Sequence, residues 1–303
     1  MDPRTRMVVV ALLGIAAIVF ASAYFNATQP AGSTSTSSPV SIHMLLGNPS
    51  GATTDSSDRD NYLMVKPYFV LSYNNSKGIP NWVSWQVTAP DLGDAPRKQT
   101  FDSDTTLPFG FTVVTQRDYD HSGFDRGHMC PHSDRAANQD MSFATFVMTN
   151  IIPQAPNVNR RAWEQLESYC RELVSREHDR LYITSGPAGQ GGRGSKGPAQ
   201  SLADGKVTVP AACWKIIVVE PDDGGDDLAR ISQNTRVIAV IVPNDQEQVG
   251  EEWSGFRTSA AAVERETGLH FFDRVRPDIA SVLRQKVDDR PIPPARPHVY
   301  RGD

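Results

Sequence analysis

The chain has 303 residues, enough for one large domain or two small ones, and its 39% hydrophobic and 21% charged residues are ordinary for a globular protein. A formal net charge of −5 argues against tight nonspecific coating of nucleic acid. It does not exclude a phosphate-binding site, because such a site needs only a local basic patch. The three cysteines, Cys130, Cys170 and Cys213, are too few for a disulfide scaffold and match no zinc-site spacing, so buried thiols and one disulfide both stay open.

Residues 1–24 have the layout of a secretory signal. Arg4 and Arg6 precede an apolar run from Met7 to Phe20, and the small residues Ala21-Ser22-Ala23 follow. The run is also nearly long enough for an uncleaved membrane anchor. Both interpretations predict an exported protein, whether secreted, periplasmic or anchored, that contacts a membrane only through this segment.

Residues 25–60 are rich in Ser, Thr, Gly, Pro and Asp, which predicts a disordered linker. The folded domain is expected over 61–290, and the four prolines from Pro291 onward predict an extended tail over 291–303.

Apolar patterning within 61–290 predicts strands joined by loops and a few helices. We expect strands at 68–73, 82–88, 145–149, 181–185, 207–209, 213–219 and 237–242. We expect helices at 158–177, 258–266 and 278–286. We expect a long loop at 89–110 and a mobile Gly-rich loop at 188–200. The continuous apolar runs at 213–219 and 237–242 predict central strands of a sheet.

The segment from Phe124 to Arg135 carries the chemistry that the rest of the chain is expected to serve. Asp125, Arg126, Gly127 and His128 place a carboxylate, a guanidinium, a residue without Cβ and an imidazole on consecutive positions. An imidazole can take a proton near neutral pH, and a guanidinium can bind phosphate through two parallel hydrogen bonds. We therefore predict a reaction centre here.

Two downstream segments strengthen this prediction. Residues 149–154 read Thr-Asn-Ile-Ile-Pro-Gln, and residues 159–167 read Asn-Arg-Arg-Ala-Trp-Glu-Gln-Leu-Glu at the start of the predicted helix. The three segments together resemble, in order and spacing, the sugar-nonspecific DNA/RNA endonuclease family. The resemblance covers roughly residues 61–289.

The resemblance implies an α+β fold, with a mixed, largely antiparallel central sheet flanked by helices and a ββα-metal finger as the active site. It also implies a Mg²⁺-dependent enzyme, with Mn²⁺ as a possible substitute, that cleaves both DNA and RNA and leaves 5′-phosphates. No segment suggests a module that reads bases, so contacts to phosphates are expected.

Phosphodiester hydrolysis needs a base for water, positive charge on the phosphorus centre and help for the departing oxygen. We predict His128 as the general base and Arg126 as the source of charge stabilisation, unless Arg126 pairs with Asp125 or another carboxylate. Asn150 matches a family position near the site, where it would bind substrate or hold the loop.

Asn159 is the predicted metal ligand, through its amide oxygen. One neutral ligand suits Mg²⁺, which keeps most of its waters; Asn157 would then cap the helix. Glu167 lies about 12 Å further along a regular helix and is rotated by roughly 80°. It is therefore assigned, as its match in the family is, to holding a metal-bound water. A solvated helix position is the alternative for Glu167.

Four arginines are predicted to contact the substrate backbone. Arg97 precedes an aromatic residue in the long loop, with Lys98 as an alternative. The other three are Arg135, Arg160 and Arg161. His121 and His132 are nearby imidazoles that compete with His128 as base, although neither has the motif context.

Two other functions remain open from the sequence. A catalytically silent nucleic-acid-binding protein at the cell surface is disfavoured because both His128 and Asn159 are present. Another ββα-metal phosphodiesterase, using Zn²⁺ or Mn²⁺, would be separated from the first hypothesis by a metal titration.

Overall fold

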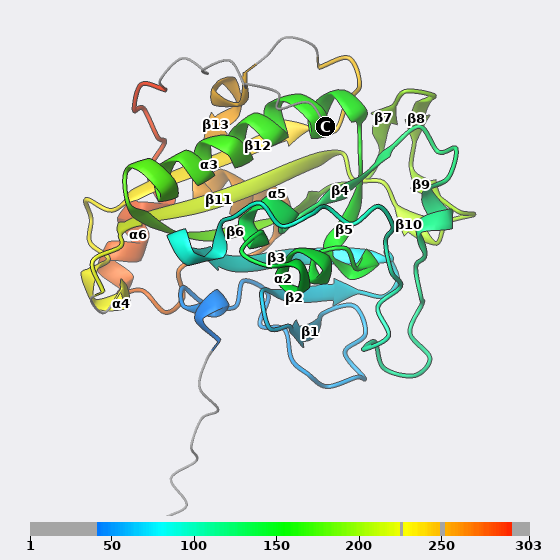
Figure 1. Cartoon of the computed structure of the whole chain (residues 1–303), viewed down its shortest axis with the longest axis horizontal. Helices are drawn as coiled ribbons and strands as arrows, with labels where there is room; N and C mark the ends of the chain where they lie inside the picture. Colours follow the sequence, from blue (N-terminus) through cyan, green and yellow to red (C-terminus); the bar gives the residue numbers. More distant parts are fainter. Residues whose placement is uncertain (1–40, 225–226, 249–251, 293–303) are drawn as a thin grey trace, which may run out of the picture. The chain divides into compact units, whose positions relative to one another are not determined.

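A seven-stranded sheet runs through the domain, and each strand is antiparallel to its neighbours. The strand order is β1 (Tyr62–Val65), β2 (Val70–Asn74), β3 (Ile79–Val87), β6 (Asp179–Ala188), β11 (Ala212–Pro221), β12 (Arg236–Pro243) and β13 (Arg257–Thr258) (Figure 1). The predicted α+β class with a largely antiparallel sheet is confirmed. β11 lies between β6 and β12, as its apolar run predicted.

The computed structural model describes residues 41–224, 227–248 and 252–292. These belong to a unit that spans Ser41–Asp303. The predicted signal or anchor at 1–24, the linker up to residue 40 and nearly all of the tail lie outside the described residues. Among the residues that are described, no helix is both long and apolar enough to cross a bilayer.

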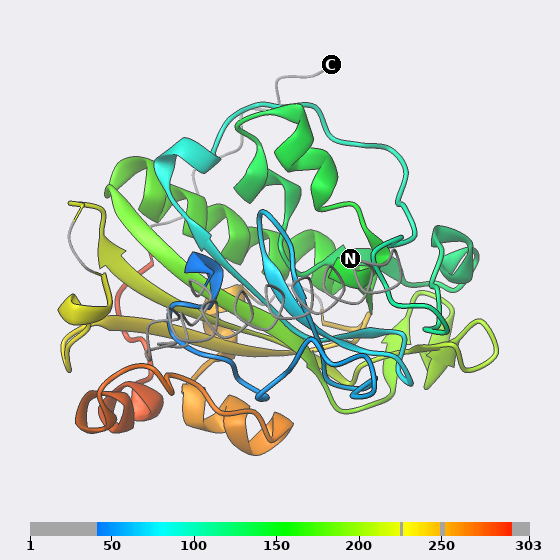
Figure 2. The same ribbon diagram turned by 90° about the horizontal axis from the view of Figure 1, so that it is seen from below.

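Helices cover both faces of the sheet (Figure 2). Along β11, Cys213 and Ile217 join the core cluster under helix α3 (Glu164–Arg176), whereas Trp214 and Ile216 join the cluster under α5 (Ala260–Thr267) and α6 (Pro277–Gln285). This alternation is the two-residue period of a strand buried on both faces. The buried face predicted for the long helix is confirmed, with these members buried: Trp163, Leu166, Cys170, Leu173 and Val174.

The Asp-Arg-Gly-His segment, residues 125–128, lies on a small hairpin beside the sheet. β4 (Asp125–His128) pairs with β5 (Ile151–Gln154), and the chain then enters the π-helical turn η6 (Val158–Trp163) and α3. At Gly127, a Cβ atom would lie 1.9 Å from Oε1 of the buried Gln154, so only glycine fits this pairing. The predicted strand–strand–helix order is therefore present.

The second strand of that hairpin was predicted too early in the chain. Residues 145–149 form no strand; they follow α2 (Gln139–Ala144) and run into the 3-10 turn η5 (Met148–Asn150). The strand begins at Ile151 and includes Pro153, a residue that usually interrupts strand pairing. Pro153 is tolerated because β4 and β5 form a two-stranded ribbon in which not every backbone N–H is needed.

The Gly-rich segment at 188–200 is not the irregular loop that was expected. It forms a hairpin of β7 (Gly192–Gly194) and β8 (Gly197–Ala199). The amide of Ser195 donates to the carbonyl of Gly123, so the hairpin tip supports the loop that enters β4. The remaining elements are η1 (Ile42–Met44), η2 (Ala89–Asp91), η3 (Gln116–Tyr119), η4 (His132–Arg135), β9 (Ser201–Leu202), β10 (Val207–Thr208), α4 (Asp227–Arg230) and η7 (Trp253–Phe256).

The predicted linker is wrong for residues 41–60, which pack on the sheet. Nε1 of Trp82 donates to Oγ of Ser50 at 2.8 Å, and Oγ of Ser84 donates to the carbonyl of His43 at 2.7 Å. Ala52 is buried in the same core cluster as Trp82. The polar residues that suggested disorder instead provide turn and side-chain hydrogen bonds to β3, which composition alone does not reveal.

All three cysteines are free and buried. Buried thiols, one of the two possibilities left open by the sequence, are what the structure contains.

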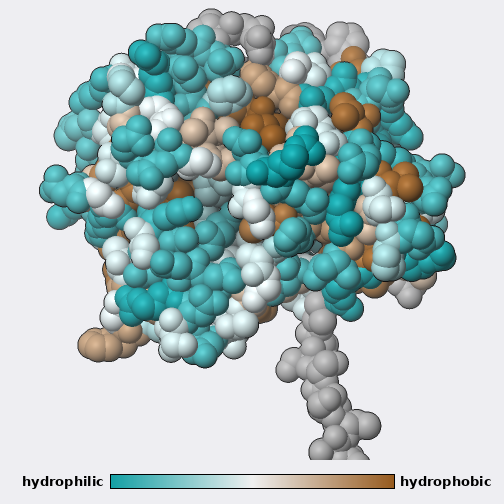
Figure 3. Space-filling view, turned by 180° about the vertical axis from the view of Figure 1, so that it is seen from behind, coloured by the Kyte–Doolittle hydropathy of each residue, from teal (hydrophilic) through white to brown (hydrophobic). Residues whose placement is uncertain are grey.

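The face of the domain in Figure 3 is largely polar, and hydrophobic residues lie there in separate groups among hydrophilic ones. Large exposed hydrophobic side chains among the described residues are Ile42, Val65, Phe109, Val113 and Val287.

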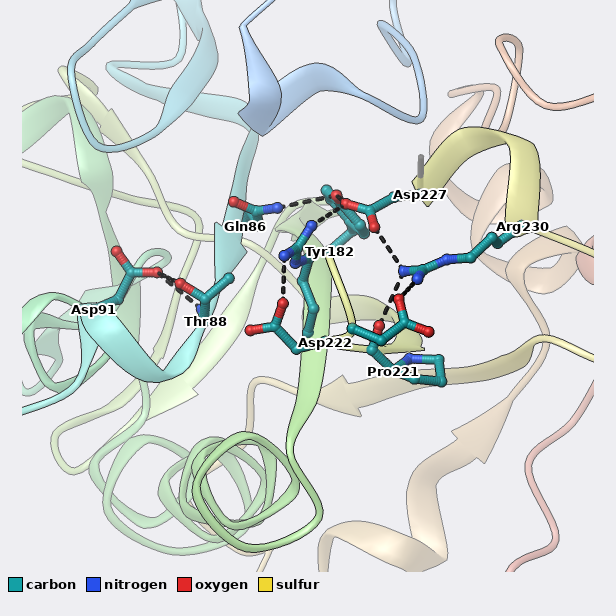
Figure 4. Close-up of polar contacts among 10 residues, drawn as sticks. Gln86, Thr88, Asp91, Tyr182, Pro221, Asp222, Asp227 and Arg230 are labelled. Carbon is teal, nitrogen blue, oxygen red and sulfur yellow. Dashed lines mark hydrogen bonds and ion pairs between the residues drawn. The ribbon is translucent and has the colours of Figure 1, made fainter. Parts of the chain in front are cut away.

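Asp227 ties α4 to the sheet through a partly buried charge network (Figure 4). Its carboxylate accepts hydrogen bonds from Arg180, Tyr182 and Arg230, and its side chain is only 5% exposed. Asp222 also pairs with Arg180, so two carboxylates share this guanidinium.

Substitution of Asp227 by alanine is expected to lower the free energy of unfolding by about 2 kcal/mol, because the hydroxyl of Tyr182 loses its acceptor and Arg180 and Arg230 each lose one of two carboxylate partners. Glu172, in an exposed helical ion pair with Arg176, is the matched control; Glu172→Ala should cost less than about 1 kcal/mol. Chemical denaturation of the two variants measures both values. Equal small losses would show that the network contributes little.

Candidate active site

A cavity of about 700 Å³ opens beside β4 and the start of the long helix. Six of the predicted site residues line it: Arg97, Arg126, His128, Asn159, Arg160 and Glu167. It is also lined by Pro131, His132, Ser133, Glu164 and Arg171. Of these, Glu164 and Arg171 were not predicted; both lie on the same helix as Glu167 at spacings of three or four residues, a signal that was available in the sequence.

His128 ends β4 and is almost fully buried. Its ring lies 4.7 Å from Phe146 in an edge-on arrangement and 5.3 Å from Phe101. Within the described residues, its Nε2 atom has no hydrogen-bond partner. Burial, followed by the positive charge of Arg97 and the proximity of His132, holds the pKa of His128 well below its usual range. The ring is therefore neutral at pH 7, with a nitrogen free to accept a proton.

Asp125 holds the candidate metal ligand in a fixed orientation. Nδ2 of Asn159 donates to Oδ2 of Asp125 at 3.0 Å, and the guanidinium of Arg160 donates to both oxygens of the same carboxylate at 2.8 and 2.7 Å. Because the amide nitrogen is occupied by Asp125, the amide oxygen of Asn159 is left for another partner. Of the alternatives for Arg126, a pair with Asp125 is not present, but a pair with another carboxylate, Asp120, is.

The helix begins irregularly, which changes the relation between Asn159 and Glu167. Residues Val158–Trp163 form a π-helical turn, wider than an α-helical one, before α3 continues. The offset of roughly 80° expected for a regular helix therefore does not apply. Asn159 and Glu167 line the same cavity despite their separation of eight residues.

Glu167 is not a solvated helix position, because its side chain is only 13% exposed. Its Oε1 atom lies 3.3 Å from Nζ of Lys215. Burial raises the pKa of Glu167, and the charges of Lys215 and Arg171 oppose that rise. The carboxylate thus combines access to the cavity with partners that favour its charged form.

Two arginines present positive charge to the cavity. Nε and Nη2 of Arg126 donate to the carbonyl of Gln116 at 3.1 and 2.7 Å, and the guanidinium also pairs with Asp120. Arg97 lies over the ring of Phe146 at 5.2 Å.

Arg97 and its alternative Lys98 differ in position. Lys98 pairs with Asp102 and lies over Phe143, whereas Arg97 lines the cavity.

Three predicted residues lie elsewhere. The side chain of Arg135 is 1% exposed and donates to the carbonyls of Tyr68 and Gln86, so it braces the core and cannot contact substrate. Asn150 is also buried: its Oδ1 accepts from the amide of Cys130 at 3.0 Å, and its Nδ2 donates to the carbonyl of Cys130 at 2.8 Å.

Asn150 therefore holds the loop after β4, and it does not reach the reacting atoms. Holding the loop is one of the two roles that the sequence left open for Asn150, whereas the predicted substrate contact of Arg135 is wrong, because a motif does not report burial. Arg161 is exposed but does not line the cavity.

The competing histidines differ in position. His132 lines the cavity, and its Nε2 lies 3.2 Å from Oγ of Ser133. Burial and the charge of Arg97 lower the pKa of His132 to about 4. His121 lies in a turn with a left-handed backbone (φ 57°) and does not line the cavity.

The donor set fits a hard, water-rich cation better than a tightly caged one. Across the described residues, no group of three or more His, Cys, Asp and Glu side chains is arranged to hold a metal. Instead, the cavity offers the amide oxygen of Asn159 and, nearby, the carboxylate of Glu167. This is the sparse oxygen set with which proteins bind Mg²⁺.

Comparison with known proteins defines the class. The family described as DNA/RNA non-specific endonuclease matches residues 47–278, more than half of the chain. The chain is therefore an endonuclease, a hydrolase that acts on the phosphodiester bonds of nucleic acids. It belongs to the DNA/RNA non-specific endonuclease family, a family of metal-dependent nucleases.

Individual relatives agree with this assignment. A nuclease of Nostoc sp. is 46% identical over 282 residues, which cover 91% of this chain and 98% of the relative. The mitochondrial nuclease EXOG of Danio rerio is 34% identical over 67% of this chain and 58% of its own length. The crystal structure of an EndoG/EndoGI complex superimposes with a TM-score of 0.62 at 26% identity, covering 77% of this chain and 91% of the matched chain.

The lowered pKa of His128 predicts a histidine that does not titrate near neutrality. An unfolded chain takes up this proton near pH 6.5, whereas the folded state does not. As the pH falls through that value, His128 therefore lowers the free energy of unfolding. NMR spectra of protein with ¹³C-labelled histidine rings, assigned by comparison with His128→Ala, should show a neutral His128 signal that is constant from pH 8 to 6. A midpoint near 6.5 would contradict the burial argument.

Proposed function

We propose that the protein is an exported, Mg²⁺-dependent endonuclease that cuts DNA and RNA with little sequence preference. One observation carries this proposal: the buried imidazole of His128, whose pKa is held well below its usual range by burial, lines the same cavity as the oriented amide of Asn159. A proton acceptor and a cation ligand in one cavity are what hydrolysis of a phosphodiester requires.

His128 acts as the general base. Its neutral imidazole accepts the proton of a water molecule as that water attacks phosphorus, and the new P–O bond forms while the bond to the departing oxygen breaks. The packing of Phe146 and Phe101 against the ring restricts its orientation, so the imidazole is held in place at the cavity before substrate binds.

Asn159 would hold the magnesium ion through its amide oxygen, and Glu167 would accept hydrogen bonds from the ion's hydration shell. When bound, the ion supplies positive charge to the scissile phosphate and to the departing oxygen. Asp125 keeps the amide turned the required way, and its own charge is balanced by Arg160.

Arg97 and Arg126 bind the phosphate and stabilise the charge that builds on it. Each guanidinium is held by groups outside the cavity lining: Arg126 by Gln116 and Asp120, and Arg97 by the ring of Phe146. Arg160 is more exposed and would contact the flanking backbone. All of these contacts are to phosphates, which supports a lack of base preference.

Export is inferred from the sequence of residues 1–24 alone, through a cleaved signal or a retained anchor. In either case the substrate is nucleic acid outside the cytoplasm.

The silent binder and the Zn²⁺ or Mn²⁺ phosphodiesterase are the alternatives. The first is disfavoured because His128 and Asn159 are both positioned at the cavity. The sparse oxygen donors there disfavour Zn²⁺ but suit Mg²⁺ and Mn²⁺ alike, so a metal titration distinguishes those two.

His128→Ala should lower the cleavage rate by about 10²–10⁴-fold, because the base that activates water is lost. The purified protein is incubated with supercoiled plasmid and with RNA, in Mg²⁺ and in EDTA, beside the variant. His270→Ala, at an exposed position outside the cavity, is the matched control and should cut at the wild-type rate.

Three outcomes of that experiment contradict the proposal. Binding without cutting by the wild type would indicate the silent binder. Cutting that resists EDTA, or that Zn²⁺ alone restores, would exclude Mg²⁺ as the cofactor. Cutting that survives His128→Ala would transfer the role of base to His132.

A further inference from the structure

We propose that Lys215 is a positioning residue of the nuclease site, which holds one oxygen of Glu167 and leaves the other for the cavity. This inference rests on the proposed function. Lys215 lies on β11, at the floor of the site, and does not itself line the cavity.

Lys215 is a charged side chain at a position where an apolar side chain would serve the fold. It is 1% exposed, on a central strand whose neighbouring positions on that face, Cys213 and Ile217, are apolar core residues. Taking an ammonium group out of water costs several kcal/mol, and an apolar side chain of similar volume would pack there at no such cost. A buried lysine on this strand is therefore better explained by the site than by stability.

The surroundings of Lys215 direct its charge to Glu167. Nζ lies 3.3 Å from Oε1 of Glu167, 4.4 Å from the ring centre of Trp163 and 5.6 Å from that of Trp85. The two indole rings favour the cation electrostatically, but neither offers a hydrogen-bond acceptor. In the described parts of the chain, the carboxylate of Glu167 is the one hydrogen-bond partner of Nζ.

Other charged groups face Glu167 from three elements, and none takes the place of Lys215. Arg171, from α3, is bonded to Asp134 of η4 at 3.2 Å. Asp134 repels Glu167, and Arg97 of the long loop attracts it from across the cavity. Lys215, from β11, is the cation that Glu167 contacts directly.

This contact has a geometric consequence for the cation site. With Oε1 bound to Lys215 on the sheet side, Oε2 has no hydrogen-bond partner among residues 41–224, 227–248 and 252–292. The ion pair restricts the rotamer of Glu167 and favours its charged form, so that the free oxygen is ready to accept hydrogen bonds from the hydration shell of a cation held by Asn159. The burial that raises the pKa of Glu167 makes this support necessary.

Lys215→Met tests the proposal, because methionine keeps much of the volume and removes the charge. Loss of a residue that orients a group around a metal typically costs 10–100-fold, so we expect a fall in kcat of about that size. Lys215→Arg should restore part of the rate, since the charge returns with a different geometry. Lys286→Met is the matched control: Lys286 donates to the carbonyl of Thr235 beside α6, and its loss should leave the rate unchanged.

A double-mutant cycle separates positioning from a general structural effect. If Lys215 acts through Glu167, Lys215→Met should slow the wild-type enzyme but have little further effect in Glu167→Gln. The loss in the wild-type background should also be greatest at low pH, since removal of the cation moves the pKa of Glu167 upward and shifts the acidic limb of the pH–rate profile to higher pH.

Calorimetric titration with Mn²⁺, in the absence of nucleic acid, gives a readout that does not depend on turnover. Lys215→Met should bind Mn²⁺ about 10–100-fold more weakly than wild type, and the difference should vanish in Glu167→Gln. Thermal unfolding is followed in parallel. If Lys215→Met does not fold, Lys215→Arg takes its place. It is compared with the wild type and, in the Glu167→Gln background, with the single Glu167→Gln variant.

Lys215→Met with wild-type kcat and Mn²⁺ affinity would overturn the inference, as would an equal loss in the Glu167→Gln background. A wild-type protein that cuts neither DNA nor RNA would instead overturn the proposed function. The Mn²⁺ cycle would still report whether Lys215 positions Glu167.

Discussion

The carboxylate of Asp125 joins the two parts of the site. It stands at the first position of β4 and receives hydrogen bonds from Asn159 and Arg160 of η6. The same strand ends at His128, so one hairpin fixes both the proton acceptor and the orientation of the cation ligand. Without this carboxylate, no hydrogen bond would fix the amide of Asn159 with its oxygen toward the cavity. The guanidinium of Arg160 would also lose the partner that balances its charge.

The chain has a net charge of −5, but its cationic side chains gather at one site, where they can bind phosphate. Arg97, Arg126, Arg160 and Arg171 all line one cavity, while acidic residues are largely used behind them as anchors. Asp120 and Asp125 fix two of these guanidiniums, and Asp134 fixes a third. Each anchored arginine loses less side-chain freedom when substrate binds, so the acidic composition helps to organise the basic surface.

Sequence patterns predicted the architecture better than the details of the site. Strongly apolar runs such as 213–219 identified the central strands, and the apolar face of the long helix was correct, because burial imposes a clear period. The start of β5 was misplaced, since Pro153 fits a two-stranded ribbon. Arg135 was predicted to contact substrate, and the role of Asn150 stayed open between substrate and loop, because a motif gives residue types and cannot report burial. Lys215 was missed because a single charge inside an apolar run gives no sign of the carboxylate opposite it.

The central claim is that Asn159, oriented by Asp125, binds the cation and that His128 stays free as the base. Crystals soaked with Mn²⁺ test this directly through the anomalous signal of the metal. The account predicts one peak about 2.1 Å from Oδ1 of Asn159, with its remaining ligands water and with Glu167 bonded to one of those waters. A peak bound to a ring nitrogen of His128 or His132 would contradict the account, because an imidazole that ligates the metal cannot accept the proton of the attacking water.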